Sequence, residues 1–191
     1  MKPYTVIPAV RGFKELEKAA SAPSDTIFLL EGEIIHLRPL VEIVKRLNKK
    51  IFLHLDLIKG IKEDEASIHY LAKDIKIDGI ISTRTSSLLH AKKFGLTTVQ
   101  RGFMIDSHSV KTILKTAEHG KPDFIELLPS YSYPKIAEIK ESTGANIILG
   151  GFIEREEDLE TFFEAGALAV STSKTHLWEY ESRLSRSISN L

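Results

Sequence analysis

The sequence has no cysteine, which excludes disulfide bonds and thiolate metal sites. It has no apolar run of roughly 18 residues and no basic segment followed by an apolar stretch at its start, so we expect neither a membrane-spanning helix nor a secretory leader. Neither sign of charge is in excess, because 26 Lys and Arg residues balance 26 Asp and Glu residues. A dedicated nucleic-acid binder usually carries a basic surface, so this balance argues mildly against one. These absences lead us to expect a cytoplasmic protein.

Short apolar runs recur at nearly regular intervals along the chain, and amphipathic, charge-rich segments separate them. Strand-then-helix units repeated in this way predict a closed (β/α)8 barrel, an α/β fold with a parallel sheet. The predicted strands are Thr5–Pro8, Ile27–Leu30, Ile51–Leu55, Gly79–Ser82, Thr98–Gln100, Phe124–Leu128, Ile147–Leu149 and Leu168–Ser171. Such barrels typically need ~250 residues. With 191 residues and no linker, we expect one compact barrel domain over residues 1–191 with minimal loops.

The helices between these runs are bounded by recognisable capping residues. Gly95, Gly144 and Gly166 each follow a predicted helix, which is typical of helix C-termini. Ser107 or Ser109 is a plausible N-cap for the fifth helix. The predicted helices are Gly12–Ala20, Ile34–Leu47, Glu63–Asp74, Ser86–Phe94, Ser109–His119, Tyr133–Thr143, Arg155–Ala165 and Thr175–Ser189.

Charged residues stand at or near the ends of several predicted strands. Alternate residues of a barrel strand face the lumen. Glu31 falls on the same face of its strand as Ile27 and Leu29. Asp56 falls on the same face as Phe52 and His54. Glu126 falls on the same face as Phe124 and Leu128. Since charge avoids the layer between strands and helices, we expect these charges to point inward or toward the mouth. The candidate residues of this group are Glu31, Asp56, Arg84, Arg101 and Glu126.

The carboxylates near arginine leave several interpretations open. They could perform acid–base chemistry, hold Mg²⁺, hydrogen-bond a polyol, or form an internal network of ion pairs. His54 is more simply a core histidine whose hydrogen bonds are satisfied than a catalytic base. The other histidines lie at no spacing typical of a metal site, so we predict no resident metal.

Two polar segments follow the seventh and eighth predicted strands. Gly150 and Gly151 end the seventh strand, and Ser171, Thr172 and Ser173 end the eighth. The loops after these strands are the recurrent phosphate site of such barrels. Glycine lets backbone N–H groups approach an anion closely, and serine hydroxyls add further donors. The alternative is an ordinary tight turn with a helix cap. Both segments occur on the strands that the fold would require, so we predict a phosphate site here.

A basic cluster ends the second predicted helix and consists of Lys45, Arg46, Lys49 and Lys50. Basic residues at a helix C-terminus complement the helix dipole, so a solvated helix end explains them without any partner.

The ordered motifs resemble the glycerol-3-phosphate-responsive antiterminator family, which regulates glycerol operons in Gram-positive bacteria. The stretches that carry the resemblance run from Val6 to Trp178, with Ser130 as one departure where the family pattern has glycine. They are Val6–Val10, Leu29–Glu31, Phe52–Gly60, Asp78–Arg84, Gln100–Arg101, Ile105–Ser107, Pro122–Pro129, Gly150–Ile153, Ser171–Ser173 and Leu177–Trp178.

The resemblance implies a barrel that senses glycerol 3-phosphate without another cofactor and stabilises a leader mRNA against termination. A two-fold dimer could then align two copies of the basic cluster into an RNA-binding stripe. Neither composition nor spacing indicates RNA binding by itself, because the sequence shows no RNA-recognition motif. An enzyme acting on a small phosphorylated substrate, such as an isomerase, aldolase or phosphodiesterase, is the alternative, since fold alone does not decide function.

Overall fold

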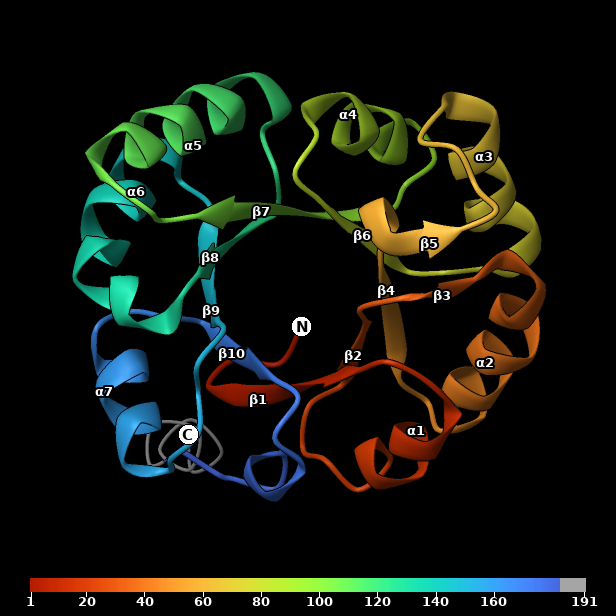
Figure 1. The fold of residues 1–191 in the computed structure, drawn as a ribbon, viewed down its shortest axis with the longest axis horizontal. Helices are drawn as coiled ribbons and strands as arrows, with labels where there is room; N and C mark the ends of the chain where they lie inside the picture. Colours follow the sequence, from red (N-terminus) through yellow and green to blue (C-terminus); the bar gives the residue numbers. More distant parts are fainter. Residues whose placement is uncertain (183–191) are drawn as a thin grey trace.

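Eight parallel strands close into a barrel in the computed structural model, which describes residues 1–182. The strands follow one another around the barrel in the order β1-β10-β9-β8-β7-β6-β4-β2, and Figure 1 views them down the barrel axis. This arrangement confirms the predicted (β/α)8 architecture. The strands are β1 (Thr5–Val10), β2 (Thr26–Leu29), β4 (Lys50–His54), β6 (Gly79–Ser82), β7 (Thr97–Phe103), β8 (Phe124–Leu128), β9 (Asn146–Gly150) and β10 (Ala169–Thr172).

Two strands extend by two residues or more beyond the C-terminal ends that the sequence predicts. Strand β1 continues to Val10 because Ala9 and Val10 pair with Phe28 and Leu29 of β2. Strand β7 continues to Phe103, since Arg101, Gly102 and Phe103 pair with β8. The longer β7 holds Arg101 within the sheet and not in a loop.

Seven α-helices surround the barrel in the described part of the chain (Figure 1). They are α1 (Phe13–Ala19), α2 (Ile34–Arg46), α3 (Glu65–Tyr70), α4 (Thr85–Lys93), α5 (Ser107–Gly120), α6 (Ile136–Thr143) and α7 (Glu157–Glu164). The N-cap predicted for α5 is wrong: Asp106 caps the helix by accepting from the Ser109 N–H, and the Ser109 hydroxyl completes a capping box. No helix within residues 1–182 is long and apolar enough to cross a bilayer.

Smaller elements break the regular alternation. The helix predicted over Glu63–Asp74 is split into α3 and a π-helical turn at Leu71–Ile75, and a 3₁₀ segment at Ser130–Lys135 precedes α6. A second sheet of two short parallel strands, β3 (Gly32–Glu33) and β5 (Ile58–Lys59), lies outside the barrel sheet. The helix predicted over Thr175–Ser189 is wrong in its described part. A 3₁₀ turn covers Thr175–Leu177, then Glu181 pairs with Thr5 of β1, and residues 183–189 lie outside the described part.

The buried apolar residues form two layers. Inside the barrel, Ile7, Phe28 and Phe52 belong to a small lumen cluster, while Ile27 and Leu29 belong to the larger cluster beneath the helices. The parity predicted for the second strand is therefore wrong, because Phe28 and not its neighbours faces the lumen. Glu31 lies beyond the end of β2 and is exposed, so it is not carried inward by that strand.

Candidate functional site

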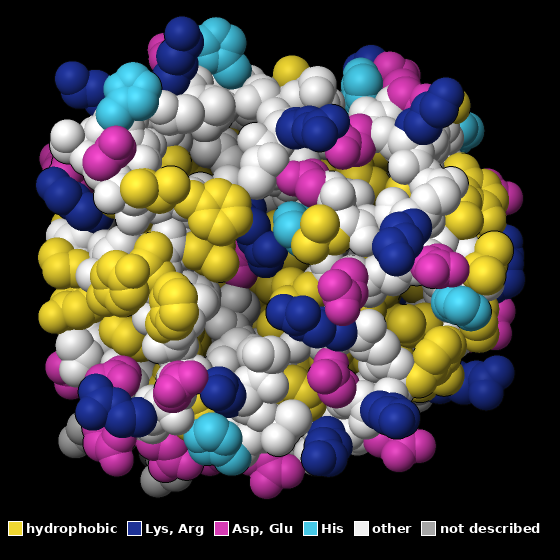
Figure 2. Space-filling model, viewed as in Figure 1, with side chains coloured by type: hydrophobic (Ala, Val, Ile, Leu, Met, Phe, Trp, Pro, Cys, Tyr) yellow, Lys and Arg dark blue, Asp and Glu magenta, His cyan; other side chains and the backbone are white. Residues whose placement is uncertain are grey.

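A cavity of about 300 Å³ opens at the C-terminal ends of the strands. Figure 2 looks onto this mouth, where charged side chains lie inside the hollow and apolar side chains gather on one side of it. The loops after β9 and β10 supply half of its wall. The lining residues are Ala9, Arg11, Leu30, Arg101, Glu126, Leu128, Gly151, Phe152, Ile153, Glu154, Ser171, Thr172, Ser173 and Lys174.

The floor of the mouth is an ion pair between neighbouring strands. Arg101 of β7 and Glu126 of β8 lie opposite each other in register. Arg101 Nε donates to Glu126 Oε2 at 2.7 Å, and the Ser171 hydroxyl donates to Glu126 Oε1 at 2.6 Å. The Glu126 side chain is only 1% exposed and that of Arg101 only 9%. Both carboxylate oxygens are thus satisfied, which a buried charge requires.

The network continues from Arg101 to His54 of β4, two strands away around the barrel. Arg101 Nη1 lies 3.2 Å from His54 Nδ1. A guanidinium can only donate, so His54 Nδ1 accepts and carries no proton. Burial lowers the pKa of His54, and the Arg101 charge lowers it further. His54 is therefore a neutral core histidine with a satisfied hydrogen bond, as the sequence predicts.

Asp56 follows β4 and is held by the loop after β6. It accepts from the Ser82 hydroxyl at 2.6 Å and from the Thr83 N–H and hydroxyl at 3.0 and 2.8 Å. Burial opposes its ionisation, but these three hydrogen bonds outweigh burial and lower the pKa of Asp56. Asp56 is thus ionised and fully engaged beside the cavity without lining it.

The loop after β9 has the backbone that the predicted phosphate site needs. Gly151 adopts φ +75°, a left-handed conformation that favours glycine. A Cβ on Gly150 would lie 2.7 Å from the Ser171 hydroxyl oxygen, so only glycine fits against the buried Glu126–Ser171 pair. Phe152 also adopts a left-handed conformation, with φ +57°. For a bulky side chain this typically costs about 1–3 kcal/mol and is concentrated at functional sites.

Ser130, the departure from the family pattern, does not need glycine's freedom. Its φ is not positive, and its N–H donates to the Gly151 carbonyl at 3.1 Å. This bond ties the loop after β8 to the loop after β9.

The structure brings together part of the predicted site. Arg101, Glu126, Gly151, Ser171, Thr172 and Ser173 line the cavity, and Gly150 lies directly behind Glu126 and Ser171. Glu31, Asp56 and Arg84 do not line it. The Glu31 carboxylate lies on the surface 3.9 Å from Arg11, and Arg84 pairs with Glu63.

The sequence reasoning missed two cations of the mouth, Arg11 and Lys174, which both line the cavity. Arg11 was overlooked because β1 was predicted to end at Pro8, two residues too early for Arg11 to follow the strand directly. Lys174 comes directly after Ser173, and its side chain pairs with Glu154 at 3.0 Å. Extending each strand by pairing would have identified both residues.

No group of three or more His, Asp or Glu side chains within residues 1–182 is arranged to hold a metal ion. In the same part of the chain, no lysine side chain is buried.

The predicted basic cluster lies at the opposite end of the barrel. Lys49 Nζ donates to the Ala22 and Ser24 carbonyls at 2.6 Å each, and burial lowers its pKa. Lys50 pairs with Asp25 at 3.4 Å. These two side chains therefore fasten the start of β2 and do not extend freely into solvent.

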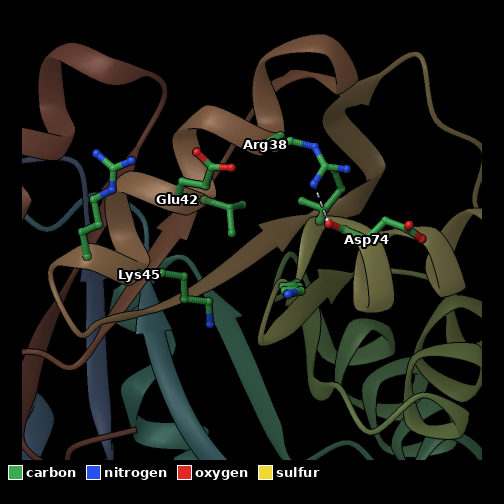
Figure 3. Close-up of a pocket in the computed structure, with 8 residues that line it drawn as sticks. Arg38, Glu42, Lys45 and Asp74 are labelled. Carbon is green, nitrogen blue, oxygen red and sulfur yellow. Dashed lines mark hydrogen bonds between the residues drawn. The ribbon is translucent and has the colours of Figure 1, made fainter.

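Lys45 and Arg46 instead line a groove of about 320 Å³ between α2 and the π-helical turn. Figure 3 shows Arg38 and Lys45 on α2 facing this groove, with Arg38 donating to the Asp74 carbonyl at 3.0 Å. Lys45 Nζ contacts Asp78 at 2.5 Å. Among the four residues of the cluster, Arg46 is the one whose side chain forms neither an ion pair nor a hydrogen bond within residues 1–182. Three of the four predicted residues thus have partners within the chain.

Similar proteins point to one regulatory family. A crystal structure of the glycerol uptake operon antiterminator regulatory protein from Listeria monocytogenes str. 4b F2365 is 35% identical, has a TM-score of 0.87, and covers 93% of this chain and 96% of its own. A glycerol uptake operon antiterminator-related protein from Thermotoga maritima MSB8 is 29% identical with a TM-score of 0.84, over 94% of this chain and 100% of its own. The uncharacterized protein YgcP of Escherichia coli strain K12 is 33% identical over 94% of both chains.

The family model described as the glycerol-3-phosphate responsive antiterminator matches residues 6–178. That range includes every strand of the barrel except Thr5, the first residue of β1, and every residue that lines the mouth. The match covers nearly the whole chain, and the relatives agree with it. The chain therefore belongs to the glycerol-3-phosphate responsive antiterminator family.

Proposed function

We propose that the mouth of the barrel binds glycerol 3-phosphate as an effector. The phosphate would lie on the backbone N–H groups and hydroxyls at Gly151 and Ser171–Ser173, beside the Lys174 and Arg11 cations. The observation that carries the proposal is the cavity itself. The cavity has a volume of about 300 Å³ and is lined by both the left-handed Gly151 turn and the polar end of β10. This volume suits a small phosphorylated molecule.

Glu126 and Arg101 would orient the glycerol part of the effector. Glu126 can accept from a glycerol hydroxyl, and Arg101 can donate to the phosphate or stay with Glu126. Glu31, Asp56 and Arg84 would take part only by leaving their present partners, so we assign them a secondary role. No further cofactor is part of this proposal.

We propose that the effector-bound protein binds leader mRNA of a glycerol operon in the cytoplasm and prevents its termination. Membership of the antiterminator family supports this function. The Arg101–Glu126 pair offers a way to sense the effector, because phosphate would compete with Glu126 for Arg101. Within residues 1–182 no lysine is buried for Schiff-base chemistry and the buried carboxylate is fully paired, which argues against the aldolase form of the enzyme alternative.

The direct test is the affinity for the leader transcript with and without saturating glycerol 3-phosphate. We expect the effector to raise RNA affinity. Thermodynamic linkage then requires the transcript to raise the affinity for glycerol 3-phosphate by the same factor. Identical RNA affinity in both conditions would contradict the regulator and favour the enzyme alternative.

A further inference from the structure

The mouth has an exposed apolar rim formed by Phe103, Ile105, Tyr131 and Phe152. These side chains are 51%, 86%, 66% and 80% exposed. Phe103 ends β7, and the other three follow β7, β8 and β9, which are neighbouring strands of the barrel. Figure 2 shows apolar side chains gathered on this side of the hollow, whereas charged side chains of both signs surround the other side. Large exposed apolar groups that cluster in this way mark an interaction surface.

Two rings of the apolar rim are already arranged as a stack. The Tyr131 and Phe152 rings have their centroids 6.2 Å apart and lie 24° from parallel. Phe152 is held outward by its left-handed backbone. Both rings are mostly exposed, so the stack is open to another planar group. Nucleic-acid bases are planar, and unpaired bases characteristically stack on exposed aromatic side chains.

Charge favours bases over phosphates as the groups that this surface recognises. The cations that follow Tyr131 and Phe152 in the chain are paired locally, Lys135 with Glu138 at 2.8 Å and Arg155 with Asp158 at 2.8 Å. A surface that attracted the RNA backbone would offer cations without carboxylate partners.

The size of the apolar rim argues against a second copy of the chain as the occupant. Four side chains of this size and exposure present roughly 500 Å². A standard interface buries about 800 Å² on each partner.

The apolar rim is connected to the proposed effector site through two short links. Phe152 lines the cavity and follows Gly151 directly. Tyr131 follows Ser130, whose N–H donates to the Gly151 carbonyl. An effector bound at Gly151 would therefore fix both rings at once.

We propose that the Tyr131–Phe152 stack, with Phe103 beside it, is a platform for unpaired bases of the leader RNA, positioned by the effector loop. The inference rests on the proposed function and adds to it the surface and the chemical group recognised. Base stacking contributes roughly 5- to 150-fold in affinity for each base.

The test uses the leader transcript with saturating glycerol 3-phosphate and the variant Tyr131→Ala, because Tyr131 does not line the cavity. We expect at least a fivefold loss of RNA affinity with the salt dependence unchanged, and unchanged binding of glycerol 3-phosphate by calorimetry. Tyr131→Phe should restore RNA affinity. Phe13→Ala removes an exposed aromatic from α1 and should leave RNA affinity unchanged.

Ultraviolet crosslinking gives an independent readout, since a stacked base crosslinks to the peptide that carries the ring. We expect the crosslinked peptides to contain Tyr131 or Phe152. Unaltered RNA affinity in Tyr131→Ala, while the parent chain binds the transcript, would overturn the platform and leave the proposed function standing. If the parent chain binds no transcript, both the base-stacking platform and the proposed function are overturned. A loss of dimers in Tyr131→Ala by sedimentation, without loss of RNA affinity, would assign the apolar rim to a second copy.

Discussion

At the mouth of the barrel, Arg101 and Glu126 are buried together with side chains 9% and 1% exposed, whereas at the opposite end Lys50 and Asp25 meet with side chains 50% and 37% exposed. Both are ion pairs, but water can replace either partner only at the exposed end. The buried charges of Arg101 and Glu126 must therefore keep a partner of opposite charge or a hydrogen bond, either within the protein or from a ligand. At the other end, the basic residues mainly fasten neighbouring chain segments. This difference is why we place ligand chemistry at the mouth.

Removing one partner of each ion pair should give the largest difference in lost stability between the two ends of the barrel. Glu126→Ala leaves the Arg101 charge buried and unpaired, so we expect the free energy of unfolding to fall by about 3–5 kcal/mol. Lys50→Ala, the matched change at the exposed pair, should cost about 0–1 kcal/mol. Chemical denaturation of both variants measures these values. Equal losses would remove the distinction between the two ends.

Two glycines with similar backbone conformations test whether the mouth binds the effector. Gly151 has φ +75°, and Gly144, at the end of α6, has φ +69°. Valine at either position should cost about 1–2 kcal/mol of stability, because a left-handed conformation disfavours a side chain. We expect only Gly151→Val to abolish binding of glycerol 3-phosphate while the barrel remains folded. Calorimetry that finds the effector bound equally by both variants would move the phosphate site elsewhere.

The histidine of the mouth should give a pH dependence of stability. The folded state lowers the pKa of His54 from 6.5, by burial and by Arg101, while Asp56 and Glu126 act in the opposite direction. Below pH 6.5 the unfolded chain takes up a proton that the folded chain resists, so the unfolding free energy should fall as the pH decreases. His54→Gln keeps an acceptor for Arg101 and should weaken this dependence. Denaturation above and below that pH measures it, and an unchanged profile would mean that other groups cause it.

The basic cluster at the far end should have the smallest effect. If Lys45, Arg46, Lys49 and Lys50 contacted RNA, replacing all four with glutamine would flatten the slope of log affinity against log salt by about 0.7–0.9 for each lost phosphate contact. Three of these side chains have partners within the chain, so we expect a change of about one contact, contributed by Arg46. Binding titrations over a range of salt concentrations decide this, and loss of several contacts would place the RNA surface at this end after all.

The regular apolar runs were sufficient to predict the barrel because its parallel strands are buried on both faces and therefore appear as continuous apolar segments. Strand ends were less predictable. Whether Arg11 belongs to the mouth depends on the pairing of β1 with β2, which no local pattern records. The parity argument succeeded for Glu126 of β8 and failed for Glu31, because Phe28 and not Ile27 or Leu29 faces the lumen in β2, and Glu31 also lies beyond the end of that strand.

The Gly150–Gly151 turn was predictable because few residues other than glycine fit such a turn. The partners that hold Asp56 and Arg84 were not, because Ser82, Thr83 and Glu63 reach them only through the tertiary fold. The exposure of Tyr131 and Phe152 was missed for a related reason. A sequence does not distinguish a phenylalanine that packs in a core from one that stands 80% exposed, as Phe152 does.

Calorimetric titration of the parent chain with glycerol 3-phosphate and with glycerol tests the central claim most directly. The polar, cation-lined mouth between Gly151 and Ser173 predicts saturable binding of glycerol 3-phosphate and much weaker binding of glycerol, because the phosphate carries the recognition. Equal affinity for the two molecules would contradict the account.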